Sequence, residues 1–207
     1  WHFLLPIGWP ALAAVCALGA IGLALHARDL RRWVAAVWAR RKPVILLAVL
    51  LAAWAANQAA GAPEVYDTYL YHLSIVRWYT SYPIVPGLGN LHERLAFNNS
   101  SLLLAAMLEV GPWRERSFHL LNGLLWMALM LQGVLGALRL ASADPKRRAA
   151  GLFDTACVIV AFAMTRWISS LSTDLPAAAL TVVAGSALLG RAGRRRPGPA
   201  ATALFGG

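Results

Sequence analysis

Charged residues are scarce in this sequence of 207 residues. Asp, Glu, Lys and Arg together make up 14% of the chain, whereas hydrophobic residues make up 59%. Soluble domains carry about 25% charged residues, so this chain has too few charges to cover a surface that faces water. The deficit argues against a soluble domain, and the high hydrophobic content excludes a disordered chain. We therefore expect most of the surface to face a lipid bilayer.

Cysteine is also rare. The two cysteines, Cys16 and Cys157, lie within apolar segments and have no ligand-like neighbour, which excludes a CxxC redox or metal site. Lysine occurs only twice, and the strong preference for arginine is typical of a GC-rich bacterial genome. The chain begins with Trp1 and ends within an apolar stretch, so we expect it to be a fragment of a longer protein.

Long apolar segments are what the sequence has in abundance. A helix needs about 20 residues to cross the hydrocarbon core of a bilayer. Five segments reach or approach this length, at residues 3–25, 43–62, 117–138, 149–165 and 175–190. The sequence predicts an all-α integral membrane protein, a single transmembrane domain over 1–207, with a large and partly helical outer loop at 63–116.

Basic residues are unevenly distributed between these five spans. The segments after the first, third and fifth spans hold 14 of the 19 Lys and Arg residues, and most acidic residues lie in the other connections. Because cytoplasmic loops collect Lys and Arg, we predict that residues 63–116 and 166–174 face the periplasm of a bacterium. The net charge of +10 is then explained by topology in the inner membrane, and no nucleic acid partner is expected.

The outer loop carries the residues on which a function can be based. Asp67 follows the end of the second span, at the membrane surface, where a partly desolvated carboxylate can act as a general base. The alternative is that Asp67 or Thr68 only caps the helix predicted over 65–80. In that helix, Tyr69 and Val76 are expected to share one face. Residues 100–108 are predicted to form a short re-entrant or interfacial helix.

Further polar and aromatic residues are candidates to bind a substrate. They are Tyr71, His72, Arg77, Trp78, His92, Glu93, Arg94, Asn98 and Asp174. Tyr71 and Trp78 share a predicted face with Asp67 and could stack on sugar rings. The cluster at residues 92–94 could hold a phosphate or a sugar, or it could be a solvated turn. Asp174 either caps the fifth span or faces the same cavity as Asp67.

Two kinds of site are not supported by the spacing of these residues. His72 lies about 140° around the helix from Asp67, so a direct Asp–His dyad is not expected. The acidic and histidine residues match no standard metal-site spacing. We therefore expect no cofactor, and the use of a divalent metal stays undecided.

Three stretches of the chain resemble a known group of proteins. They are YDTYLYH, YPIVPGLGNLHERLAFNNS and SSLSTDLP. In these stretches the chain resembles bacterial polytopic membrane proteins related to the GT-C glycosyltransferases. The resemblance implies a sugar donor linked to polyprenyl phosphate, transfer on the periplasmic side, and an essential acid soon after a helix end. The position of Asp67 matches that acid, although the paired acids and the eight or more spans common in the class are absent from this sequence.

The implied reaction is attack of a hydroxyl, from a glycan or lipid acceptor, on the anomeric carbon of the donor sugar. Asp67 would take the proton, and Arg77, His92 and Arg94 would stabilise the leaving phosphate.

Two other classes of function stay open: a transporter or flippase-like protein, and a non-catalytic membrane component of cell-envelope polysaccharide assembly. A transporter needs polar groups at depth. The polar residues within the predicted spans form no obvious relay for a proton or a substrate. They are Asn57, Gln58, His119, Asn122, Gln132 and Asp154.

Overall fold

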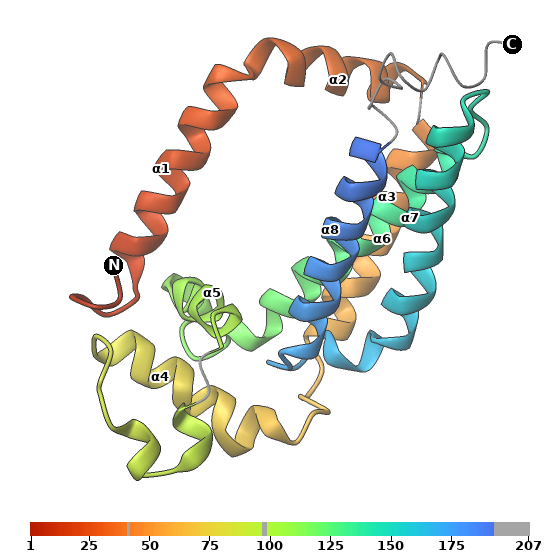
Figure 1. Cartoon of the computed structure of the whole chain (residues 1–207). Coiled ribbons are helices and arrows are strands. Elements are labelled where there is room, and N and C mark those ends of the chain that lie inside the picture. Colours follow the sequence, from red (N-terminus) through yellow and green to blue (C-terminus); the bar gives the residue numbers. More distant parts are fainter. Residues whose placement is uncertain (41, 97–98, 193–207) are drawn as a thin grey trace, which may run out of the picture.

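The structure is a computed structural model in which residues 1–40, 42–96 and 99–192 are described. Within these ranges the chain consists of helices and turns, without a β-strand, so the predicted all-α class is confirmed. Figure 1 shows the long helices running up and down, with α4 and α5 at one end and α2 across the other. We call these the loop end and the basic end, respectively.

Five long helices coincide with the five predicted apolar spans. They are α1 (Trp9–Leu25), α3 (Lys42–Ala59), α6 (Leu121–Arg139), α7 (Pro145–Ala163) and α8 (Asp174–Ala192). α1 begins at Trp9 and not at Phe3, because Pro6 and Gly8 interrupt the apolar run and Pro10 favours the first turn. α7 begins at Pro145, so the basic residues after it lie inside the helix. Short 3₁₀ turns occupy Leu88–Asn90, Glu93–Ala96, Gly111–Trp113, Ser117–His119 and Thr165–Trp167.

Two of the described helical segments are long and apolar enough to cross a membrane, by length and composition only. They are Lys42–Ala59 and Ser117–Arg139, while Trp9–Leu25 and Asp174–Leu189 are apolar but shorter. Only 11% of the Lys42–Ala59 segment is buried, whereas the core helix of a soluble protein is mostly buried. Large apolar side chains also point outward from α1, α3, α7 and α8, and examples are Leu18, Leu46, Ile159 and Leu180. Extensive exposed apolar surface marks contact with lipid or with protein.

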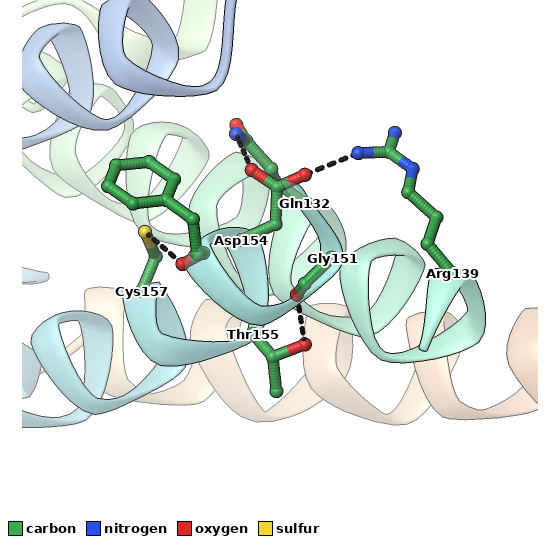
Figure 2. Close-up of polar contacts among 7 residues, drawn as sticks. Gln132, Arg139, Gly151, Asp154, Thr155 and Cys157 are labelled. Atoms are coloured by element: carbon green, nitrogen blue, oxygen red, sulfur yellow. Dashed lines mark hydrogen bonds and ion pairs between the residues drawn. The ribbon is translucent and has the colours of Figure 1, made fainter. Parts of the chain in front are cut away.

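α6 and α7 form a closely packed antiparallel hairpin. Glycine makes the close approach possible, since a Cβ atom on Gly136 would lie 2.5 Å from the Cβ atom of Asp154. Asp154 is fully buried by this contact. Its carboxylate pairs with the guanidinium of Arg139 and accepts a hydrogen bond of 2.9 Å from Nε2 of Gln132 (Figure 2). Because an unpaired buried charge costs several kcal/mol, these two partners make the carboxylate tolerable between the helices.

Two apolar cores lie within the part of the molecule that the structure describes. The first joins α3, α6, α7 and α8 around Trp126, whose Nε1 donates a 2.7 Å hydrogen bond to the carbonyl oxygen of Ala161. The second lies at the loop end, where α4 (Leu73–Ser81) and α5 (Ser101–Leu108) pack together. α5 is the short helix predicted over 100–108, and Leu102 is buried in this core. Its apolar sequence therefore serves packing within the fold.

A helical segment is present within the predicted range 65–80, but Tyr69 and Val76, expected on one face, differ in burial. Thr68–His72 forms a π-helical turn that leads into α4. A π turn adds one residue to the helical repeat, so faces deduced from 3.6 residues per turn do not hold across it. Val76 is buried, whereas Tyr69, expected on the same face, is 61% exposed.

One helix was not predicted. The span pattern assigns residues 27–40 to a basic connecting loop, but they form α2 (Ala27–Arg40). The repeat of Leu30, Val34 and Trp38 at four-residue spacing is the sequence signal for this helix. A search for spans of about 20 apolar residues does not detect so short an amphipathic element.

Gly136→Ala is expected to lower the free energy of unfolding by about 1–3 kcal/mol, the usual cost of an overpacked contact. The matched control is Gly19→Ala in α1, where a new Cβ would meet nothing within 4 Å and alanine favours the helix. Thermal unfolding of the purified protein in detergent measures both variants. Equal melting temperatures would contradict the close packing of α6 against α7.

Candidate functional site

Asp67 forms the centre of a polar cluster at the loop end. Its Oδ1 lies 3.2 Å from Nη1 of Arg94, and the two side chains are 42% and 37% exposed. The guanidinium of Arg94 also lies over the ring of Tyr71, 5.2 Å from the ring centroid. Tyr71 in turn makes a side-chain hydrogen bond with Asp67. The cluster therefore joins the start of the 68–81 helical segment to the turn at Glu93–Ala96, which is far away in the sequence.

The capping alternative for Asp67 is not what the structure shows. Asp67 occupies the N-cap position of the π turn but makes no side-chain capping hydrogen bond there. Thr68 is fully buried, and its Oγ1 accepts a 3.1 Å hydrogen bond from the backbone N–H of Leu171. Both side chains are used in contacts with distant parts of the chain.

Two serines attach the start of the outer loop to the turn between α7 and α8. Oγ of Ser170 accepts hydrogen bonds from the backbone N–H groups of Glu64 and Val65, at 3.1 and 3.2 Å. The hydroxyl of Ser169 donates a 3.0 Å hydrogen bond to the carbonyl oxygen of Ala62. These bonds fix the backbone immediately before Asp67.

Asn122 of α6 holds the same turn from the inside of the molecule. This residue is fully buried, and its Nδ2 donates to the carbonyl oxygens of Trp167, Ser170 and Ser172, at 3.1, 2.8 and 2.9 Å. An amide nitrogen has two hydrogens, so three acceptors share them. The turn that leads into Asp174 is thereby fixed relative to α6.

Asp174 lies close enough to act electrostatically on the residues that neighbour Asp67. It is the first residue of α8 and lies in its first turn, not at the capping position, which Thr173 occupies. A carboxylate is favoured there by the helix dipole. The negative charges of Asp67 and Asp174 both raise the pKa values of Tyr71 and His72. Two carboxylates from separate segments therefore act on the same pair of side chains.

The pKa values of Tyr71 and His72 are both shifted mainly by burial. Desolvation raises the pKa of Tyr71 above its ordinary value of 10.0, with a further contribution from Asp67. Desolvation lowers the pKa of His72 below 6.5, and the two carboxylates oppose this only in part. Nδ1 of His72 has no hydrogen-bond partner within the described ranges. Burial thus favours the neutral form of His72 near pH 7, and no hydrogen bond joins Asp67 to His72 among the described residues.

Arg77 does not join Asp67. It lines a separate cavity of about 570 Å³ between the start of α1, α4 and the segment after α5. Arg114, Glu109 and Glu115 line the same cavity. The carboxylate of Glu109 accepts hydrogen bonds from the backbone N–H of Glu115 and from Ser117, so it orders the loop around the cavity.

Trp78 lines a second, apolar cavity of about 770 Å³. This cavity lies between α1, α4, α5 and the loop at 83–89, and its lining includes Val15, Leu18 and Leu103. The ring of Trp78 also packs against that of Tyr82 in a tilted arrangement, with ring centroids 5.1 Å apart. Residues 1–7 and 95–96 also contribute to its lining, so no single stretch of sequence indicates this cavity.

The remaining candidate residues lie in or near the 92–94 turn. His92 and Glu93 are exposed, and Nδ1 of His92 accepts a 3.2 Å hydrogen bond from the backbone N–H of Arg94. Arg94 alone of the three reaches Asp67. Asn98 lies outside the described residues. Across the described ranges, no group of three or more His, Cys, Asp or Glu side chains could hold a metal ion.

Comparison with known proteins identifies the family. The family model described as "Domain of unknown function (DUF8201)" matches residues 1–198. The chain belongs to this family. No curated protein and no solved structure matches it. The family description assigns no activity, so the function has to be argued from the geometry at the loop end.

Asn122→Leu is expected to loosen the loop end, because the near-isosteric side chain leaves three carbonyl oxygens without their donor, two of them in buried hydrogen bonds. An unsatisfied buried polar group costs about 1–3 kcal/mol, so the melting temperature should fall. Hydrogen exchange measured by mass spectrometry should become faster in peptides that contain Leu171 and Thr68. The exposed Asn57→Leu is the control, and equal exchange in the two variants would contradict the role of Asn122.

His72→Gln is expected to reduce the pH dependence of stability. Because burial holds the pKa of His72 below the unfolded value of 6.5, the unfolded state takes up this proton first. The stabilising contribution is therefore present above pH 6.5 and is lost as the pH falls through the folded-state pKa. Melting temperatures measured from about pH 7 to about pH 5 should fall less in the variant than in the wild type. The substitution His92→Gln, at an exposed position, serves as the control. If the melting temperature of His72→Gln falls with pH as steeply as that of the wild type, His72 is not the group responsible.

Proposed function

We propose that the chain is the membrane-embedded part of a GT-C-like glycosyltransferase of the bacterial inner membrane. It transfers a sugar from a polyprenyl-phosphate donor to a glycan or lipid acceptor. In this proposal α1, α3, α6, α7 and α8 cross the membrane, and residues 63–116 face the periplasm. The outward-facing leucines and isoleucine on these helices support contact with lipid.

The distribution of charge over the fold supports this orientation. Asp67, Glu109 and Asp174 belong to the loop end, whereas Arg139 and Arg147 belong to the basic end, at the junction of α6 and α7 (Figure 1). The sequence asymmetry between alternate loops thus corresponds to two ends of one folded body. Positive charge is retained on the cytoplasmic side of membrane proteins, so the basic end is the cytoplasmic one.

The observation that carries the proposal is the placement of the Asp67 carboxylate. It is partly exposed, it is oriented by Arg94 and Tyr71, and the charge of Asp174 acts on the same neighbours. An acceptor hydroxyl is a weak nucleophile, so a positioned base must remove its proton as the bond forms. A carboxylate that is held in place but still accessible suits this role.

The chemical step follows from these positions. The acceptor oxygen attacks the anomeric carbon, the bond from that carbon to the phosphate oxygen breaks, and the acceptor proton passes to Asp67. Polyprenyl phosphate leaves with the electron pair of the broken bond. The guanidinium of Arg94, beside Asp67, favours the negative charge that develops on the leaving phosphate. The residues of this chain thus supply a base and a cation, without a nucleotide.

The apolar cavity supports a lipid-linked donor. Its volume of about 770 Å³ and its lining of α1 and α5 side chains suit part of a prenyl chain. Trp78 lies at this cavity and belongs to the same helical segment that begins beside Asp67. The segment therefore connects the place proposed for the lipid tail to the place proposed for the sugar.

The second candidate is a transporter or flippase-like protein, and the buried Asp154 is the observation that favours it. Ionisable residues inside the membrane often mark transport pathways. However, the carboxylate of Asp154 is already paired with Arg139 and Gln132 (Figure 2), and the neighbouring glycines allow close packing. These contacts support a structural role, so we favour the glycosyltransferase.

Asp67→Asn in the intact protein is expected to lower sugar transfer by at least about a hundredfold, the usual contribution of a general base. Membrane insertion should be unchanged. Proteoliposomes supplied with undecaprenyl-phosphate-linked hexoses and a glycan acceptor measure transfer, and Asp29→Asn at the basic end is the matched control. Wild-type turnover by Asp67→Asn would refute the catalytic role. Transfer by none of the proteins would instead favour the transporter or a non-catalytic component of polysaccharide assembly.

A further inference from the structure

α2 joins α1 to α3 across the basic end (Figure 1). All of its described side chains after Ala27 are exposed. A helix of 14 residues without packing on one face is marginal in water. Its apolar face therefore needs an environment outside the described fold.

The exposed apolar residues of α2 form one stripe. Leu30, Val34 and Trp38 are 40%, 48% and 66% exposed and follow each other at four-residue spacing. From the helical repeat, Arg28 and Arg32 lie about 120° and about 160° from the middle of this stripe, and Arg31 lies about 60° from it, at its border. The helix thus has an apolar face and an arginine-rich face, which is the pattern of helices that lie in a membrane interface.

Three arginines of α2, Arg28, Arg31 and Arg32, are available to an anionic partner. Within the part of the chain that the structure describes, Arg28, Arg31 and Arg32 take part in none of the ion pairs, which are Arg94–Asp67, Arg139–Asp154 and Arg147–Asp144. Asp29 is the one acidic residue in the sequence of α2. Positive charge continues around the same end, where α6 ends and α7 begins (Figure 1).

We propose that α2 lies in the headgroup region of the cytoplasmic leaflet and binds anionic phospholipids. Leu30, Val34 and Trp38 enter the boundary of the acyl chains, and Arg28, Arg31 and Arg32 bind phosphate groups. The inference rests on the proposed membrane embedding, because α2 is joined at both ends to helices that cross the bilayer in that proposal. Arginine suits the lipid phosphate, since its planar guanidinium donates two parallel hydrogen bonds to two phosphate oxygens.

The depth of α2 can be tested with nitroxide labels in the full chain, reconstituted in vesicles of phosphatidylcholine with and without phosphatidylglycerol. In a Cys16→Ser, Cys157→Ala background, one label is attached through Val34→Cys on the apolar face. The matched control is Ala35→Cys, about 100° further around the helix, and Leu18→Cys reports on α1. We expect the label at 34 to be more accessible to oxygen than to a water-soluble nickel chelate, and the label at 35 to show the reverse.

The outcomes separate this inference from the membrane embedding itself. If the labels at 34 and 35 are equally accessible to the nickel chelate while the label at 18 is in lipid, α2 is in water and the inference is overturned. If the label at 18 is also accessible to the chelate, the proposed embedding of α1 fails as well. A label at 34 that is shielded from both reagents would indicate a protein partner, and it would also overturn the inference.

The contribution of the arginines needs a separate measurement. Spin-labelled phosphatidylglycerol and phosphatidylcholine report which lipid the protein prefers in its first lipid layer. We expect the preference for phosphatidylglycerol to fall at least about fivefold in Arg28→Gln/Arg31→Gln/Arg32→Gln, since one basic residue near an anionic surface already contributes about that factor. The control variant Arg114→Gln/Arg116→Gln/Arg166→Gln removes the same charge at the loop end, where a smaller change is expected. An unchanged preference in the α2 variant, or an equal fall in the control, would refute binding of anionic lipid by α2.

Discussion

The side-chain amide of Asn122 donates hydrogen bonds to three backbone carbonyls in residues 167–172, and the arrangement of the loop end depends on them. Through Ser169 and Ser170, the same turn holds the backbone that precedes Asp67. One buried amide therefore organises segments that are about a hundred residues apart, as the 106-residue separation of Glu64 and Ser170 illustrates. Oδ1 of Asn122 has no hydrogen-bond partner among the described residues, so the hold on the turn comes from the three bonds that Nδ2 donates.

The hairpin of α6 and α7 positions Asn122, which lies in α6, against the turn that follows α7. Its glycines let the two backbones approach, as small residues do between membrane helices, and this approach encloses Asp154. Breaking the pair with Arg139 would leave a buried charge without compensation. The hairpin is thus determined by shape and by charge together, and α3 and α8 pack against it in the first core.

The loop end combines opposing electrostatic effects within a small region. Burial keeps His72 neutral, while the charges of Asp67 and Asp174 favour its protonated form. Arg94 offsets the negative charge of Asp67 and at the same time contacts Tyr71. An oriented carboxylate beside a cation is an arrangement suited to proton transfer with a departing phosphate, and the apolar cavity near Trp78 adds room for a lipid. The proposed sugar transfer and the proposed lipid contact of α2 thus occupy opposite ends of the molecule.

The sequence by itself determined the helical class, the five long apolar helices and the difference in charge between the two ends. These properties follow from local composition and periodicity, which act over one helix at a time. Tertiary structure alone decided that Arg94 and not Arg77 reaches Asp67, that Asn122 holds the 167–172 turn, and that a π turn exposes Tyr69. Contacts of this kind join residues far apart in the chain, and a single π turn shifts every later side chain. The long-range contacts are encoded by no local pattern, because they depend on how the separate helices pack.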